Sequence, residues 1–464
     1  MSILKRLNLD IFYCFCLAFL LWILCLNLKE ILLVQAWRHD ALYYLGSYLG
    51  KLKTEGRWIN YYLFSFLKAF PAHGSALLCV VFFSGFAFIA ANKGLPWRSS
   101  RIFTLLLLQI SPIYSIIHWP ATPLPANFFL FLCAYLSRKY RYEYVVPLAG
   151  ILFHSTFNNL YNLVPLLYIG EIKTVRKFFK FLLWWTLSYI LGYAIAQLMT
   201  KLITGQFVQI AAWRNPHFVT SFAVLEQNLK RVSWDFISHL RAFGYAHAVA
   251  CLLVSTACLW KKSLNTFQLL LLLGVGLACY AQSVPVGIGI SLRTAYPLYA
   301  ALLFPFYFAL QSSRHWPLVL SIILFVSSGL FTDNINALRY YNGVTSVWKK
   351  YLNELPIDPK LNSKLIFLGN NSECQRIERH LMWTINLNNR ITEGLGSSMR
   401  WHPVARSLGY KVVQFIWAHE KDVKRISPKW LDECVFQSNM LYQWTEHEGT
   451  VVVRFNQELL KTLK

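Results

Sequence analysis

The chain has 464 residues, of which 56% are hydrophobic and only 14% are charged, and its formal net charge is +24. A water-soluble protein of this length carries more charge, so the composition predicts a polytopic α-helical membrane protein. The basic residues fall in short clusters between apolar segments rather than in a basic tract with interleaved aromatic residues, which argues against nucleic-acid binding.

Nine apolar segments are candidates for membrane passage. Short cationic clusters, such as those at 93–101 and 173–180, separate them. With Lys5 and Arg6 in the cytoplasm, every such cluster also falls on the cytoplasmic side, as the positive-inside rule requires. The nine segments cover residues 11–35, 74–92, 102–119, 127–137, 181–202, 243–260, 266–284, 296–312 and 316–332.

A tenth apolar segment, residues 145–170, has cationic residues at both ends, so both ends are expected in the cytoplasm. Its 26 residues are too few for two full crossings of about 20 residues each. We therefore predict a hairpin broken at residues 154–159, with its polar turn in a cavity lined by protein. Counted as two passes, the hairpin brings the total to about 11 passes, with the N-terminus inside and the C-terminus outside.

This topology divides the chain into a transmembrane domain, residues 1–332, and a C-terminal domain, residues 333–464. The transmembrane domain has three outer loops, at 36–73, 203–242 and 285–295. The C-terminal domain is predicted to be a small extracytoplasmic α/β unit. Its strands are expected at 364–369, 410–418 and 450–456, and its helices near 343–355 and 374–387.

Eight of the ten cysteines lie inside apolar segments, where they act as small apolar side chains. Cys374 and Cys434 are the only two thiols of the C-terminal domain. In an oxidising compartment we expect them to form a disulfide, although two separate free thiols are the alternative. No C-x-x-C, H-x-x-x-H or nucleotide-binding motif occurs, so neither a metal nor a cofactor is expected.

Four of the eight carboxylates in residues 1–332 fall on the outer face: Asp40, Glu55, Glu226 and Asp235. Asp40 follows the first apolar segment and is a candidate general base or hydrogen-bonding anchor. The alternative is that it only caps a helix beginning near Ala41.

Arginines at the outer face are candidates for binding a lipid phosphate, because a guanidinium binds phosphate through two parallel hydrogen bonds. Arg57 follows Gly56, which lets the backbone approach a ligand closely. Arg293 lies in a glycine-containing loop, and Arg214 in the second outer loop. Each of these arginines also has a simpler interpretation, in which its side chain extends to the lipid headgroups.

Aromatic residues gather around the first outer loop. They are consistent with an interfacial aromatic belt, but stacked rings also bind sugar faces. The set consists of Trp37, Tyr43, Tyr44, Tyr48, Trp58, Tyr61 and Tyr62.

The pattern in this loop resembles that of the GtrII-type glucosyltransferases, multi-pass bacterial inner-membrane enzymes with a GT-C-like architecture. The resemblance consists of an acid, Asp40, then Tyr43 and Tyr44, and about fifteen residues after Asp40 the sequence Glu-Gly-Arg-Trp at 55–58. Members of that family carry two adjacent acids where this chain has His39 and Asp40. The rest of the chain is similar in topology only, with an outer-loop arginine and a polar extracytoplasmic tail.

The resemblance implies an enzyme that moves a hexose, with glucose as the expected sugar, from a polyprenyl-phosphate donor to a lipid-linked glycan such as O-antigen. It implies a location in the bacterial inner membrane with the active site on the periplasmic face, and cooperation with a donor-sugar synthase and a flippase. Asp40 would act as the catalytic base. The substrate- and phosphate-binding residues would be Arg57, Arg293, Glu55, Trp58, His39, Tyr43, Tyr44 and Arg214.

Two other functions remain open. An O-antigen polymerase also joins lipid-linked glycans at this face, but it relies on a large arginine-rich outer loop, and the loop at 203–242 is modest. A flippase or transporter of lipid-linked glycans would be expected to have polar residues buried in its helices and an internal repeat, and the sequence shows neither clearly.

Overall fold

In the computed structural model of the chain, two groups of residues are described. The helical part comprises residues 3–34, 48–67, 70–117, 122–211, 214–311 and 316–353. The C-terminal part comprises residues 364–369, 376, 412–417, 435, 437–438, 442–447 and 450–462.

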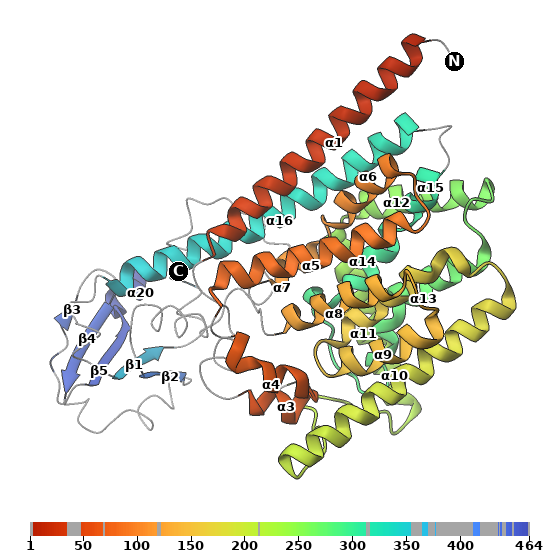
Figure 1. The fold of residues 1–464 in the computed structure, drawn as a ribbon. Coiled ribbons are helices and arrows are strands. Elements are labelled where there is room, and N and C mark those ends of the chain that lie inside the picture. Colours follow the sequence, from red (N-terminus) through yellow and green to blue (C-terminus); the bar gives the residue numbers. More distant parts are fainter. Residues whose placement is uncertain are drawn as a thin grey trace.

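Five helices in the described part of the chain are long and apolar enough to cross a membrane. They are α1 (Ile3–Leu32), α5 (Ala72–Asn92), α10 (Val175–Thr204), α13 (Thr266–Ser283) and α16 (Trp316–Asn353). A sixth span results if α11 (Phe222–Phe243) and α12 (Tyr245–Trp260), which are bent by 92° relative to each other, are counted together. The protein is therefore a polytopic helical membrane protein (Figure 1).

The other helices are shorter, and two of the predicted apolar segments are each divided into two helices. Residues 102–119 include the end of α6 and all of α7, and Pro112 lies in the first turn of α7. Residues 296–312 form α14 and α15, with Pro305 at the start of α15. Proline lacks an amide hydrogen, which explains both breaks. The shorter elements are α3 (Leu49–Glu55), α4 (Trp58–Leu67), α6 (Trp97–Leu107), α7 (Ser111–Ile116), α8 (Pro123–Leu136), α9 (Tyr142–His154), the 3₁₀ helices η1 (Asn158–Glu171) and η3 (Leu292–Thr294), α14 (Tyr296–Leu303), α15 (Pro305–Gln311) and α20 (Gln457–Thr462).

Helix α16 does not end at residue 332, where the last apolar segment and the transmembrane domain were predicted to end. It continues through Asp333 to Asn353 and includes most of the helix predicted near 343–355. Its polar extension runs beside the end of α1 (Figure 1), where the buried carboxylate of Glu30 accepts hydrogen bonds from Arg339 Nε (3.2 Å) and Asn342 Nδ2 (3.2 Å). A change from apolar to polar composition does not break a helix whose polar side chains have partners.

Residues 145–170 fold back on themselves, as the hairpin prediction requires. Helix α9 ends at His154, and η1 begins at Asn158, so the break lies inside the predicted interval. The start of α9 and the end of η1 lie side by side. The Tyr168 hydroxyl of η1 donates to the backbone carbonyl of Tyr140, which precedes α9 (3.3 Å). At the same end, Lys93 Nζ donates to the carbonyl of Leu167 (2.9 Å).

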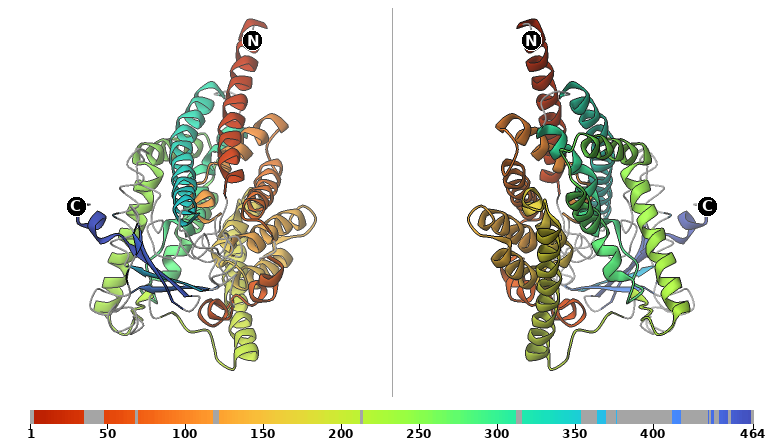
Figure 2. Two further views of the ribbon diagram at one scale, coloured as in Figure 1. Left: turned by 90° about the vertical axis from the view of Figure 1, so that its left-hand side faces the viewer. Right: turned by 90° about the vertical axis from the view of Figure 1, so that its right-hand side faces the viewer.

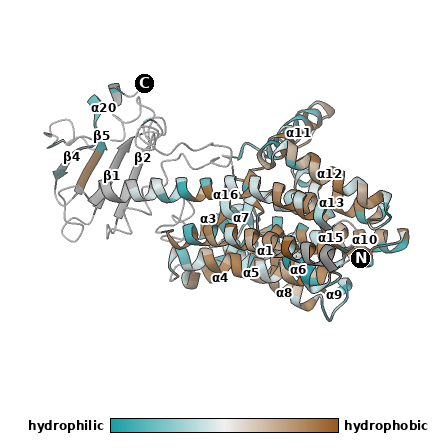
Figure 3. Cartoon of the chain, turned by 90° about the horizontal axis from the view of Figure 1, so that it is seen from above, coloured by the Kyte–Doolittle hydropathy of each residue, from teal (hydrophilic) through white to brown (hydrophobic). Residues whose placement is uncertain are grey.

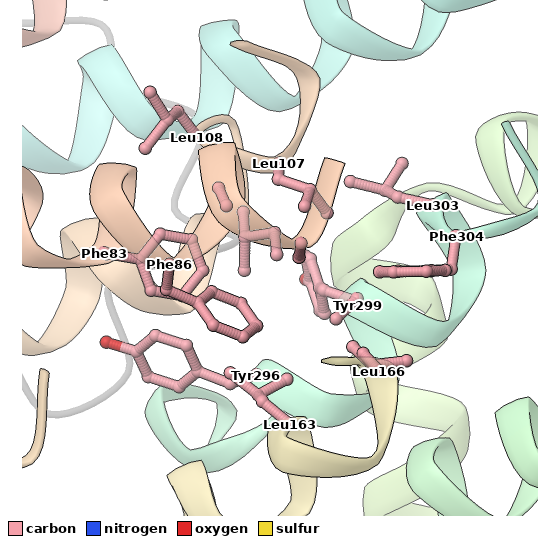
Figure 4. Packing of buried hydrophobic residues seen from close by; sticks show 14 of the residues in the cluster. Phe83, Phe86, Leu107, Leu108, Leu163, Leu166, Tyr296, Tyr299, Leu303 and Phe304 are labelled. Carbon is pink, nitrogen blue, oxygen red and sulfur yellow. The ribbon is translucent and has the colours of Figure 1, made fainter. Parts of the chain in front are cut away.

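Apolar side chains enclose the returning arm η1 on several sides. Figure 4 shows Leu163 and Leu166 of η1 among aromatic and aliphatic residues of other helices, all of them buried. The 3₁₀ arm is therefore covered by protein, as backbone that departs from a regular α-helix must be in a membrane. The labelled neighbours are Phe83 and Phe86 of α5, Leu107 of α6, Leu108, Tyr296, Tyr299 and Leu303 of α14, and Phe304.

The outgoing arm α9 packs directly on α10 through small residues. A Cβ atom placed on Gly192 of α10 would lie 2.1 Å from the carbonyl oxygen of Gly150 in α9, and one on Gly150 would lie 2.2 Å from that of Ser188. Only glycine allows the two backbones to come this close, which is how helices in lipid gain van der Waals contact.

The described strands form one mixed sheet in the order β2-β1-β5-β4-β3. Strand β1 (Lys364–Gly369) is parallel to β2 (Val412–Trp417) and to β5 (Thr450–Phe455), and β4 (Tyr442–His447) is antiparallel to β5 and to β3 (Gln437–Ser438). The three predicted strands are thus confirmed, whereas the helix predicted at 374–387 lies, apart from Arg376, outside the described residues.

The sheet lies at the opposite end of the molecule from the N-terminus of α1 (Figures 1 and 2). Viewed from above, the helices are mostly coloured as hydrophobic, whereas the part of α16 nearest the sheet is hydrophilic (Figure 3). The composition of the chain therefore changes along α16 itself.

The close packing of α9 on α10 predicts that Gly192→Ala destabilises the protein, because the new methyl group collides with the backbone of Gly150. We expect a loss of about 1–3 kcal/mol, as for other overpacked sites. The thermal midpoint of the detergent-solubilised protein should fall. Gly170→Ala is the matched control, since a Cβ there meets nothing within 4 Å. Equal midpoints for the two variants would contradict this packing.

Candidate functional site

Segments predicted on the outer face meet at one end of the bundle. Helices α3 and α4 of the first outer loop join at Gly56, which has a left-handed conformation (φ 70°) that favours glycine. A Cβ on Gly56 would lie 3.1 Å from the Val208 side chain, and the Gln209 amide donates to the carbonyl of Lys53 (2.9 Å). The first and second outer loops are therefore in direct contact.

The carboxylate of Glu55 is the centre of an ion cluster at this contact. Its oxygens lie 2.5 Å from Arg57 Nη2, 2.6 Å from Arg214 Nη2 and 3.1 Å from Lys51 Nζ. The Glu55 side chain is only 8% exposed. The cluster thus links two arginines that are 157 positions apart in the sequence and that were both predicted to bind phosphate.

Glu55 is an anion at neutral pH. Burial alone would raise its pKa, but the positive charges of Arg57, Lys51 and Arg214 outweigh this effect and hold the pKa well below the usual range. A carboxylate with so low a pKa is a weak base. Glu55 is therefore suited to orienting the two arginines and unsuited to accepting a proton from a substrate hydroxyl.

Arg57 also connects the first outer loop to two other segments. Its Nη1 donates to the Thr122 hydroxyl (2.8 Å), next to the start of α8, and its guanidinium lies 5.6 Å from the ring centre of Phe157. Phe157 is in the break of the hairpin, between α9 and η1. Thr122 and Phe157 could not be selected from the sequence, because neither residue type is specific for a site.

Helix α4 covers the same break. The side-chain amide of Asn60 donates to the Thr156 carbonyl (3.4 Å) and to the Tyr48 hydroxyl (3.3 Å), and both Asn60 and Tyr48 are fully buried. Trp58, predicted to bind substrate, begins α4, and its ring packs edge-on against Tyr62 (6.5 Å between centroids).

The third outer loop reaches the break from another side. Asn159 Nδ2 donates to the Thr294 carbonyl (3.3 Å), and the rings of Phe157 and Tyr296 are 6.4 Å apart. Arg293 precedes Thr294 within η3. The structure thus brings the Arg293 segment to the same hairpin break that Arg57 contacts.

A stripe of polar residues on α11 holds the loop that leads to Arg293. Asn228 Nδ2 donates to the Val284 carbonyl (2.9 Å), Arg231 Nη1 donates to the Gly287 carbonyl (2.6 Å), and the Ile290 amide donates to Asp235 Oδ2 (2.7 Å). The predicted loop at 203–242 is therefore mainly helix. Asp235, one of the four carboxylates predicted on the outer face, and Arg231 both hold backbone groups of this loop. Asn228, Arg231 and Asp235 are spaced by three and then four residues, which places them on one face of a helix. This spacing could have identified the stripe from the sequence.

Several predicted site residues lie outside the described residues: Asp40, His39, Tyr43 and Tyr44, and the cysteines Cys374 and Cys434. Their roles and the disulfide remain predictions. Within the described part of the chain, no group of three or more His, Cys, Asp or Glu residues is placed to hold a metal ion.

Comparison with known proteins does not assign the site a function. The chain matches no model of a known family, no curated protein and no solved structure. The function of the site has to be inferred from its own residues and their contacts.

The ion cluster predicts that Glu55→Gln is strongly destabilising, because it leaves buried cations without this carboxylate. A loss of about 3–5 kcal/mol is expected for breaking a buried ion pair. The control is Glu226→Gln, which removes an exposed pair with Lys230 and should change the thermal midpoint little.

The same cluster has a defined pH dependence. A depressed pKa in the folded state means that Glu55 contributes fully above its ordinary pKa of 4.5 and progressively less as the pH falls below it. The difference in thermal midpoint between wild type and Glu55→Gln should be constant from neutral pH down to the ordinary pKa and then shrink. A difference that grows on acidification would show that the carboxylate is not held as an anion.

Proposed function

We propose that the chain is an integral membrane glycosyltransferase. It transfers a hexose, with glucose as the expected sugar, from a polyprenyl-phosphate donor to a lipid-linked glycan such as O-antigen, at the periplasmic face of the bacterial inner membrane. The observation that carries the proposal is the meeting of the outer-face segments on the Glu55, Arg57 and Arg214 cluster, directly over the hairpin break.

The proposed topology has about eleven passes, with the N-terminus in the cytoplasm and the C-terminal α/β domain in the periplasm. Contacts between loops support it, because segments predicted on the same side contact one another. On the predicted inner side, Arg98 pairs with Asp10, and Asn265 Nδ2 donates to the Lys173 carbonyl (3.4 Å). On the predicted outer side, the His217 amide donates to the Val286 carbonyl (2.8 Å).

Arginines are the residues that this reaction requires at the leaving group. When the bond between the anomeric carbon and the phosphate oxygen breaks, the lipid phosphate gains negative charge, which preorganised cations stabilise. Arg57, Arg214 and Arg293 are proposed for this role. Glu55 and Thr122 fix the guanidinium of Arg57, so it does not need to reorganise when the phosphate binds.

Asp40 is proposed as the general base. The acceptor hydroxyl oxygen attacks the anomeric carbon and its proton passes to the Asp40 carboxylate, while the bonding pair of the donor leaves with the lipid phosphate. Of the predicted carboxylates in the first outer loop, Glu55 does not suit this role because three cations hold its pKa down. Asp40, which follows the first apolar segment in the sequence, is therefore retained as the base.

A flippase or transporter is the alternative that a structural feature favours. Asn27 of α1 and Asn334 of α16 are fully buried, as polar residues along a transport path would be. Asn334 Nδ2, however, donates to the Gln109 carbonyl (2.9 Å) in the turn between α6 and α7, so it satisfies a buried backbone acceptor. The convergent arginines at one end of the bundle are better explained by transfer chemistry than by transport.

The proposal predicts that Asp40→Asn abolishes glycan modification while the protein stays in the membrane, because asparagine keeps the size but removes the proton acceptor. Activity should fall by about 10²–10⁴-fold. Asp10→Asn is the matched control, since Asp10 lies near the other end of α1 and pairs with Arg98. The measurement is modification of lipopolysaccharide, by mass spectrometry, in cells lacking the native gene. Near-normal activity of Asp40→Asn would refute the base, and asparagine would then simply cap a helix as well as aspartate does.

Arg293→Lys tests the phosphate role separately. Lysine keeps the charge but loses the two-pronged guanidinium, so donor use should weaken without a change in which acceptor is modified. Unchanged kinetics with the lipid-phosphate sugar would remove Arg293 from the site.

A further inference from the structure

Helix α11 is nearly perpendicular to the helix that follows it. The axes of α11 and α12 differ by 92°, and Gly244 lies between them with φ 93° and ψ 118°, a backbone conformation that L-residues rarely adopt. A Cβ on Gly244 would also lie 2.5 Å from the His247 ring. The bend is therefore fixed by the sequence. If α12 runs along the membrane normal, α11 lies parallel to the membrane surface.

The two helices expose different side chains. Helix α12 exposes apolar residues such as Val249, Leu252 and Leu253 and has no charged residue, as expected for a surface in contact with acyl chains. Helix α11 exposes large apolar residues too, with Phe222 80% and Trp234 68% exposed.

Between these apolar residues, α11 also exposes charges. Glu226 and Lys230 form an i,i+4 pair, and Arg241 is exposed near the end of the helix. A helix in water would not present Phe222 and Trp234 so openly, and a helix in hydrocarbon would not present three charges. Aromatic and charged side chains on one surface are typical of the headgroup region.

We propose that α11 is an interfacial helix that lies in the phospholipid headgroup region, with Phe222 and Trp234 inserted among the lipids. At the Gly244 bend it joins α12, whose large exposed residues are apolar. The leaflet is the one at the end of the bundle that carries Glu55 and Arg57, because α11 holds the loop leading to η3 there. The polar stripe of α11 thereby holds the Arg293 loop at the level of the headgroups. This inference does not depend on the proposed function.

Two photoreactive phospholipids test the proposal on the unmodified protein in vesicles. One carries a diazirine in the headgroup and the other at the end of an acyl chain, and mass spectrometry maps the labelled residues. Residues 222–237 should be labelled by the headgroup probe about tenfold more than by the chain-end probe, as expected for a helix at the interface. Residues 249–253 of α12 should show the reverse, and the buried Leu163 of η1 should carry neither label.

Two results would overturn the proposal. Chain-end labelling of α11 as strong as that of α12 would show that α11 lies within the hydrocarbon as part of a broken span. Absence of both labels from α11, with α12 labelled normally, would show that water or another protein covers this surface. Neither result bears on glycan modification, so the proposed function would stand or fall separately.

Discussion

A break in the backbone inside a membrane bundle needs partners from the protein itself, because hydrocarbon offers none. The hairpin formed by α9 and η1 is such a break, and much of the surrounding structure supplies its partners. Asn60 donates to the Thr156 carbonyl at the break, and Lys93 donates to the Leu167 carbonyl near the other end of η1. Apolar residues of α5, α6 and α14 surround η1 and keep it from lipid.

The need to cover the break accounts for the position of the ion cluster. Helix α4 closes over Thr156, and this brings Arg57 beside Phe157 and Thr122. Glu55 also forms an ion pair with Arg214 of the second predicted outer loop. Arg57 and Arg214 are both oriented by contacts with Glu55, and Arg57 also by Thr122. Preorganised cations of this kind suit a reaction in which a phosphate gains charge.

The charge distribution of the sequence was sufficient to predict the hairpin. Both flanks of residues 145–170 are cationic, so both ends are expected on the same side of the membrane. The segment is too short for two full crossings, so it has to turn back within the membrane. The three predicted strands were recognisable because alternating or continuous β-branched and aromatic residues form short runs. The hairpin and the strands could be predicted because each depends on residues that are neighbours in the sequence.

Other features depend on tertiary contacts and could not be predicted. Glu55 and Arg214 are 159 positions apart, and nothing in either segment indicates the pairing. The extension of α16 beyond Thr332 contacts α1 through Arg339 and Glu30, which are 309 positions apart and meet only in the folded protein. Helix α11 lies within the predicted loop at 203–242, and the contacts of its polar stripe with the 284–290 segment exist only in the folded protein.

In the proposed function, the ion cluster of Glu55, Arg57 and Arg214 binds the phosphate of a lipid-linked sugar. Native mass spectrometry of the protein in lipid, titrated with polyprenyl phosphate, measures this binding directly. Arg57→Gln should raise the Kd about tenfold or more, as expected for loss of a charge-assisted, two-pronged hydrogen bond. Arg98→Gln, which removes an arginine paired with Asp10 on the predicted opposite side, should leave the Kd unchanged. An unchanged Kd for Arg57→Gln, or an equal loss in both variants, would contradict the claim.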